Sequence, residues 1–124
     1  MIFEADMDEQ KEKVYFLRIN TRYNRIGIHR HTLESIGNPE FIHLGFHPTS
    51  GRLMVLGTWG DEKKAIRVHY DQKGSFYFYS KSLINGIRMI NGALNKQGSY
   101  LFKGTLIDSI PAICFSVCET KNEE

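Results

Sequence analysis

The sequence has little of what marks a secreted or membrane-spanning protein. Only two of its 124 residues are cysteines, and we expect Cys114 and Cys118 on one strand, too far apart for a disulfide. We interpret them as core thiols in a reducing compartment. No run approaches the roughly 18 apolar residues of a membrane span, and residues 1–6 do not resemble a signal peptide. We therefore expect a cytoplasmic protein with no membrane partner.

Motifs of familiar catalytic chemistry are also lacking. The chain has no Gly-x-x-x-x-Gly-Lys phosphate loop and no nucleophile elbow. Residues 61–64 contain the Glu-x-Lys of one nuclease class, but no aspartate in the preceding strands completes a metal site, and a solvated charged turn is the alternative. His29, His31, His43 and His47 form two pairs that nothing in the sequence brings together. We expect no enzyme, no metal and no cofactor.

Charge is distributed unevenly along the chain. Residues 1–13 hold five acids and two lysines, and residues 119–124 hold three acids and one lysine. The body, residues 14–118, carries thirteen Lys or Arg against six Asp or Glu. A basic body is typical of a domain that binds a polyanion or an acidic protein, although many soluble domains are moderately basic without one. We expect the acidic ends to be frayed tails.

Periodicity predicts mostly strands, with one short and one longer helix. In residues 14–59 we expect strands at 14–19, 25–29, 41–47 and 52–59, and a helical turn at 32–36 that Gly37 stops. In residues 64–118 we expect strands at 65–70, 75–79, 100–107 and 112–118, with a turn at 71–74. Ser80 or Ser82 is expected to cap a helix that runs to about Leu94 and buries Leu83, Ile87, Ile90 and Leu94.

The two halves resemble one another. At an offset of fifty residues, residues 26–33 align with residues 76–83 at the passage from strand to helix. We therefore predict an α+β, mostly β fold in which two tandem ββαββ units, 14–59 and 64–118, form one pseudo-symmetric domain at 14–118. Chance similarity of two β–α–β stretches is the alternative. The predicted core is Ile26, Ile28, Leu33, Leu44, Val55, Phe76, Phe78, Leu83, Ile87, Phe102 and Phe115.

A family resemblance starts from Arg25-Ile26-Gly27-Ile28-His29, with Ile36-Gly37 at the helix end. This pattern resembles the Arg-apolar-x-Ile-Pro strand of the AbrB and MazE swapped-hairpin fold, found in transition-state regulators and antitoxin DNA-binding domains. Two such units in one chain would be similar to the MraZ pseudo-dimer. The resemblance implies DNA binding and transcription regulation. His29 stands in place of the family's proline, and of its basic positions only Arg18 and Arg25 match. Residues 32–40 and 79–84 also resemble small proteins of Gram-positive phages and mobile elements.

Two sets of residues are candidate binding sites. Arg18, Arg22, Arg25 and Arg30 surround the first hairpin and the helix entry, where the resemblance implies contacts with DNA phosphates. A solvated basic edge is the alternative. On the strand at 75–79 we bury Phe76 and Phe78 and expose Tyr77 and Tyr79. With Lys73 and Lys81 nearby, these tyrosines could stack on single-stranded bases, anchor a protein partner, or simply cover neighbouring strands.

The leading interpretation is a non-enzymatic binding module, a small nucleic-acid-binding regulator. The alternatives are a phage or mobile-element inhibitor that binds a host protein, such as an anti-CRISPR or another anti-defence factor, and a clamp-like scaffold protein. Binding with a steep salt dependence would favour the regulator, whereas a tight, salt-tolerant protein complex would favour the inhibitor. A monomeric pseudo-dimer and a homodimer are both compatible with the sequence.

Overall fold

The computed structural model describes residues 14–117, which form an eight-stranded antiparallel sheet and two α-helices. The architecture is mostly β, as the sequence predicts. The strands are β1 (Tyr15–Asn20), β2 (Arg25–His29), β3 (Phe41–Phe46), β4 (Leu53–Thr58), β5 (Ile66–Arg67), β6 (Ser75–Tyr79), β7 (Ser99–Leu106) and β8 (Ala112–Val117). The helices are α2 (Arg30–Glu34) and α3 (Lys81–Ile90), and α3 is followed by a 3-10 turn, η1 (Gly92–Leu94).

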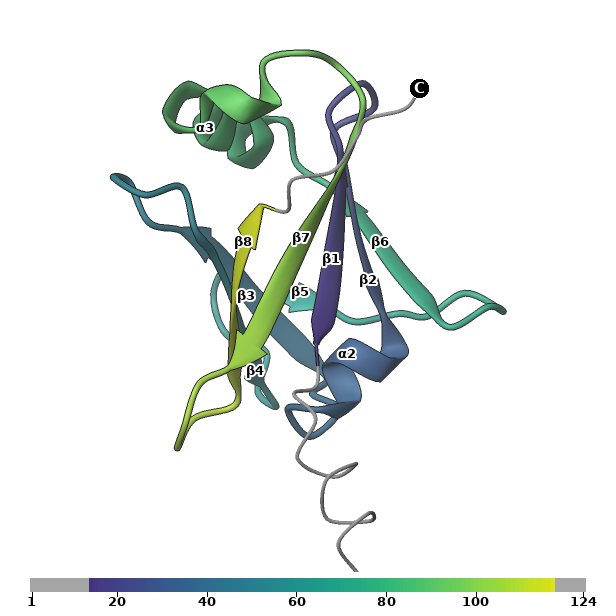
Figure 1. The fold of residues 1–124 in the computed structure, drawn as a ribbon. Coiled ribbons are helices and arrows are strands. Elements are labelled where there is room, and N and C mark those ends of the chain that lie inside the picture. Colours follow the sequence, from purple (N-terminus) through teal and green to yellow (C-terminus); the bar gives the residue numbers. More distant parts are fainter. Residues whose placement is uncertain (1–13, 118–124) are drawn as a thin grey trace, which may run out of the picture.

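The strands lie in the order β5-β3-β4-β8-β7-β1-β2-β6. The sheet curls around the core, with α3 at one end and α2 toward the other (Figure 1). Three hairpins, β1–β2, β3–β4 and β7–β8, are joined by pairings between distant segments, of β1 with β7, β4 with β8 and β2 with β6. The first hairpin is therefore held between the closing hairpin and β6.

Alternation along the strands defines an inner and an outer face of the sheet. Leu17 and Ile19 on β1, and Ile26 and Ile28 on β2, are each at most 1% exposed, whereas Arg18 between them is exposed. Period-two alternation places such residues on one side of a strand, and the core lies on that side. Eight of the predicted core residues are buried; Leu44, Phe78 and Leu83 are only partly buried against the core.

The long helix begins where the sequence predicts and ends earlier. Ser80 is its N-cap, and the Ser80 Oγ accepts a hydrogen bond from the Leu83 N–H at 3.2 Å. The predicted end at Leu94 is wrong, because Asn91 has an extended backbone and the chain continues as η1. Arg88 fastens this turn by donating to the carbonyl oxygens of Leu94 and Asn95. Ile87 and Leu94 are buried as predicted, whereas Leu83 and Ile90 are only partly buried and Ile84, which was not predicted, is fully buried.

The predicted strand at 65–70 is wrong in length and partner. Only Ile66 and Arg67 are in strand conformation, and they pair with Ile42 and Phe41 of β3 rather than with β6. The turn at 71–74 does form, since the Gly74 N–H donates to the Asp71 carbonyl oxygen at 3.1 Å. However, β5 and β6 lie at opposite edges of the sheet order, so the second predicted unit lacks its first hairpin. The predicted strands at 25–29 and 75–79 are confirmed, and each begins and ends at the predicted residue.

Close packing against Gly104 leads to a stability prediction. A Cβ at Gly104 on β7 would lie 2.5 Å from a ring carbon of Phe115 and 2.7 Å from Ile113, both fully buried. Gly104→Ala is therefore expected to lower the free energy of unfolding by about 1–3 kcal/mol, measured by urea denaturation. Gly45→Ala is the matched control, because a Cβ there would meet nothing within 4 Å. Equal stability of the two variants would contradict this packing.

Candidate nucleic-acid interface

The first hairpin presents three of the four predicted arginines together. Arg18 is exposed at the middle of β1, Arg25 is half-buried at the start of β2, and Arg22 is exposed in the turn between the two strands. Their core-facing neighbours are buried, so Arg18 and Arg25 project from the outer face. Arg30 lies at the other end of β2, at the start of α2, where its guanidinium lies 4.8 Å from the centre of the Tyr70 ring. The structure thus separates Arg30 from the other three.

The two predicted tyrosines project from the same outer face as these arginines. Because β6 pairs with β2, Tyr77 lies opposite Gly27 and Tyr79 lies opposite Arg25. A Cβ on Gly27 would be 2.8 Å from a ring carbon of Tyr77, so only glycine leaves room for the ring in this position. The Arg25 guanidinium lies 4.8 Å from the centre of the Tyr77 ring. Residues that the sequence assigned to two separate sites therefore meet in one.

Further side chains belong to this surface, which we call the arginine–tyrosine face. We define it by eight outward-facing residues of β7, β1, β2 and β6, namely Phe16, Arg18, Arg25, His29, Tyr77, Tyr79, Leu101 and Lys103. Phe16, Tyr77 and Tyr79 are 43%, 45% and 65% exposed. A hollow of about 220 Å³ lies between Phe16, Arg18 and Tyr77. Sequence analysis missed Phe16 and Lys103, although the alternation around Arg18 was sufficient to place Phe16 beside it.

The electrostatic character of this face is positive. None of its four strands contains an aspartate or glutamate, and the six acidic residues of the described chain all lie in α2, turns or loops. Among residues 14–117, no arginine or lysine of the face forms an ion pair. No carboxylate of residues 14–117 thus neutralises these cationic groups, and they can attract an anionic ligand.

The two predicted lysines flank the tyrosine strand. Lys73 lies in the turn before β6, and Lys81 is the first residue of α3, two positions after Tyr79. Asp71 fixes the turn, because its carboxylate accepts hydrogen bonds from the N–H groups of Lys73 and Ser75, both at 2.9 Å. The hydrogen bond from Ser75 is the main reason that the pKa of Asp71 lies below its usual value. Each end of β6 thus carries one exposed ammonium group.

The histidines form local contacts in separate parts of the molecule. The Nδ1 of His29 accepts the His31 N–H at 3.1 Å and caps α2, and the Nδ1 of His47 accepts the N–H groups of Thr49 and Ser50, both at 3.2 Å. Within the described part of the chain, no three His, Cys, Asp or Glu side chains come close enough to hold a metal ion. The proposed thiol pair cannot be compared with the structure, since Cys118 lies outside the described residues.

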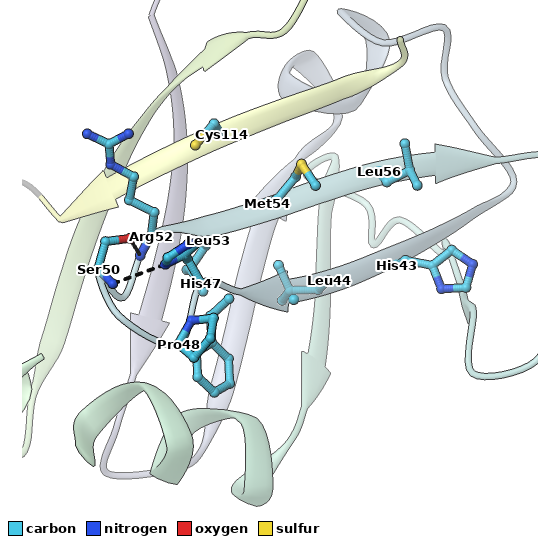
Figure 2. Close-up of a pocket in the computed structure, with 12 residues that line it drawn as sticks. His43, Leu44, His47, Pro48, Ser50, Arg52, Leu53, Met54, Leu56 and Cys114 are labelled. Carbon is cyan, nitrogen blue, oxygen red and sulfur yellow. Dashed lines mark hydrogen bonds between the residues drawn. The ribbon is translucent and has the colours of Figure 1, made fainter. Parts of the chain in front are cut away.

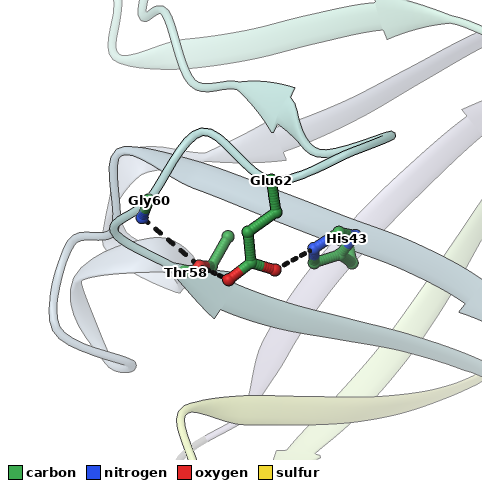
Figure 3. Close-up of polar contacts among 4 residues, drawn as sticks. All are labelled: His43, Thr58, Gly60 and Glu62. Atoms are coloured by element: carbon green, nitrogen blue, oxygen red, sulfur yellow. Dashed lines mark hydrogen bonds and ion pairs between the residues drawn. The ribbon is translucent and has the colours of Figure 1, made fainter.

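Glu62, from the Glu-x-Lys motif, has a structural contact. Its Oε1 accepts from His43 Nε2 at 2.9 Å, and its Oε2 accepts from the Thr58 hydroxyl at 2.9 Å (Figure 3). These two hydrogen bonds, that from His43 first, hold the pKa of the Glu62 carboxyl below its usual value. The contact fastens the loop after β4 to the outer side of β3. Both oxygens of the Glu62 carboxylate thus accept hydrogen bonds from side chains of this protein.

Comparisons with known proteins found no match: no family model, no curated protein and no solved structure corresponds to this chain. Neither helix between residues 14 and 117 has the length and apolar character needed to cross a membrane.

The Glu62 contact predicts a measurable pH dependence. Since both donors favour the ionised carboxylate, the contact is present above the lowered pKa of Glu62 and is lost as the pH falls through it. His43→Ala is expected to raise the pKa of Glu62. This pKa can be measured by carbon-detected NMR of the Glu62 carboxyl during a pH titration. His69→Ala also removes a histidine but touches nothing near Glu62, so it should leave the pKa unchanged. A pKa of Glu62 that stays the same in His43→Ala would show that His43 is not the main cause.

Proposed function

We propose that this chain is a non-enzymatic nucleic-acid-binding module that contacts its ligand through the arginine–tyrosine face. The observation that carries the proposal is the Arg25 guanidinium stacked on Tyr77, beside Arg18, on four strands without a carboxylate. Arginines supply hydrogen-bond donors to phosphates, and exposed aromatic rings supply flat surfaces for bases. A polyanion made of phosphates and bases matches both properties.

The arrangement favours a single strand over a duplex. Tyr77 and Tyr79 are two residues apart on one face of β6, which sets their Cα atoms about 6.6 Å apart along the strand. Bases can stack on such rings only when they are unpaired and splayed out. A duplex keeps the faces of its bases stacked on one another, so it would leave the aromatic rings without stacking partners.

We also propose that the sheet consists of two interlocked ββαββ units, the arrangement that the AbrB-like resemblance implies. In support, β1 pairs with β7 and β5 pairs with β3, so the first strand of each unit pairs with the third strand of the other. Equivalent strands also pair, β2 with β6 and β4 with β8. Gly27 and Tyr77, which are fifty residues apart, lie directly opposite one another, as expected on a pseudo-twofold axis. One chain would then supply both halves and bind as a monomer.

The role of the arginines can be tested with Arg18→Gln/Arg25→Gln. We expect weaker binding of a fluorescent oligothymidine and a salt dependence whose slope, in log Kd against log salt, falls by about 1.4, or about 0.7 for each lost phosphate contact. Lys63→Gln/Lys64→Gln removes the same charge from the loop after β4 and should keep the full slope. Binding that does not depend on salt, or no binding at low salt, would overturn the proposal. A tight, salt-tolerant complex with a protein would instead favour the inhibitor.

The tyrosines can be tested for stacking. Tyr77→Leu/Tyr79→Leu keeps apolar cover on the sheet but removes both aromatic faces. Each stacked base contributes about 1–3 kcal/mol, so affinity for single-stranded DNA should fall at least about tenfold. Tyr77→Phe/Tyr79→Phe retains the rings and should bind normally. Duplex DNA of the same length is the comparison ligand, and equal affinity for duplex and single strand in the unmodified protein would argue against stacking.

A further inference from the structure

An apolar groove lies on the other half of the sheet, on the outer side of β3, β4 and β8. It has a volume of about 750 Å³, within the range of small-molecule sites. Met54, Leu56 and Cys114 provide much of its apolar lining (Figure 2). Met54 is 41% exposed, although it lies in the middle of a strand.

The groove exists because a side chain is missing from the outer face of β3. Gly45 lies opposite Met54, and a Cβ built on Gly45 would meet nothing within 4 Å. Gly27, on the outer face of β2, is covered by the Tyr77 ring, whereas nothing from the described chain covers Gly45. The floor of the groove is therefore open to a ligand.

The polar groups lie at the two ends. Figure 2 shows His43 at one end and His47, Ser50 and Arg52 at the other, with Leu44, Met54 and Leu56 between them. His43 is already bonded to Glu62. His43 and His47 are four residues apart on an extended segment, so the apolar stretch between them is about 13 Å long.

The end at His47 and Arg52 carries the positive charge of the groove, in the Arg52 guanidinium. The Nδ1 of His47 accepts two backbone N–H groups, so the proton of a neutral ring is on Nε2. The Arg52 guanidinium makes no hydrogen bond or ion pair within residues 14–117. Figure 2 shows this guanidinium extending toward β8 near Cys114, and its planar fork of donors is suited to a carboxylate. Among residues 14–117, no carboxylate lines the groove.

We propose that this groove binds a free aliphatic carboxylate of medium chain length. The chain lies over Gly45 between Met54 and Leu56, and the carboxylate meets Arg52. The apolar lining accounts for the chain, and the Arg52 guanidinium without a partner among residues 14–117 accounts for the anionic head. This site is on different strands from the arginine–tyrosine face, so it does not depend on nucleic-acid binding.

The test is a titration of the ¹⁵N-labelled protein with decanoate and, in parallel, with decanol. We expect saturable shifts at Gly45, Met54, Arg52 and Cys114 with decanoate, and at least about tenfold weaker binding of decanol, which lacks the charge. Arg52→Gln should weaken decanoate binding by a similar factor and leave decanol unchanged. Arg67→Gln, on β5, is the matched control and should bind decanoate normally.

A second variant tests the groove itself. Gly45→Val places a side chain where the Cβ has free space, in a strand that tolerates valine, so the fold should be retained and binding of both ligands lost. Equal affinity for decanoate and decanol, shifts outside the groove, or no saturable shifts would overturn the proposal. So would co-sedimentation with anionic lipid vesicles without binding of free decanoate, or a concentration-dependent dimer that Gly45→Val abolishes.

Discussion

The antiparallel pairing of β2 with β6 is the contact on which the outer surface of this protein depends. It brings residues 25–29 beside residues 75–79 and sets Gly27 against Tyr77. The register is strongly determined, because a slip of one residue would turn Phe76 outward and bury Tyr77. Phe76 is 3% exposed and Tyr77 is 45% exposed, so such a slip would lose core packing. The position of the stacked arginine follows from the same register.

Gly27 and Gly45 both lie on the outer face of the sheet, but the space above them is filled at Gly27 and open at Gly45. Gly27 lets the Tyr77 ring lie against the backbone, which places that ring below the Arg25 guanidinium. Gly45 has no such neighbour, and the outer side of β3 remains hollow. The first surface is basic and aromatic, and the second is apolar with donors at one end. We therefore propose different ligands for them, a nucleic acid and an aliphatic carboxylate.

The distribution of acidic residues supports this division of the surface. Between residues 14 and 117 every strand lacks aspartate and glutamate, and the six acidic residues of this part lie in α2, turns and loops. Two of these acidic residues form local contacts. Asp71 accepts backbone N–H groups in the turn before β6, and Glu62 holds the loop after β4 to His43. The sheet faces consequently carry only neutral or positive side chains, which is the condition that an anionic ligand requires.

The sequence by itself determined seven of the eight strands, all but β5, and which side of them faces the core. Alternation placed Ile26, Ile28 and Phe76 inward and Arg18, Tyr77 and Tyr79 outward, because side-chain direction in a strand is a local property. It did not determine the partners of β5 and β6, or the early end of α3, since these depend on contacts with distant segments. Only the tertiary structure joined Arg25 to Tyr77 and opened the groove above Gly45. Arg25 and Tyr77 lie on strands far apart in the chain, and the groove combines the local β3–β4 hairpin with the distant β8, so no local pattern alone determines either feature.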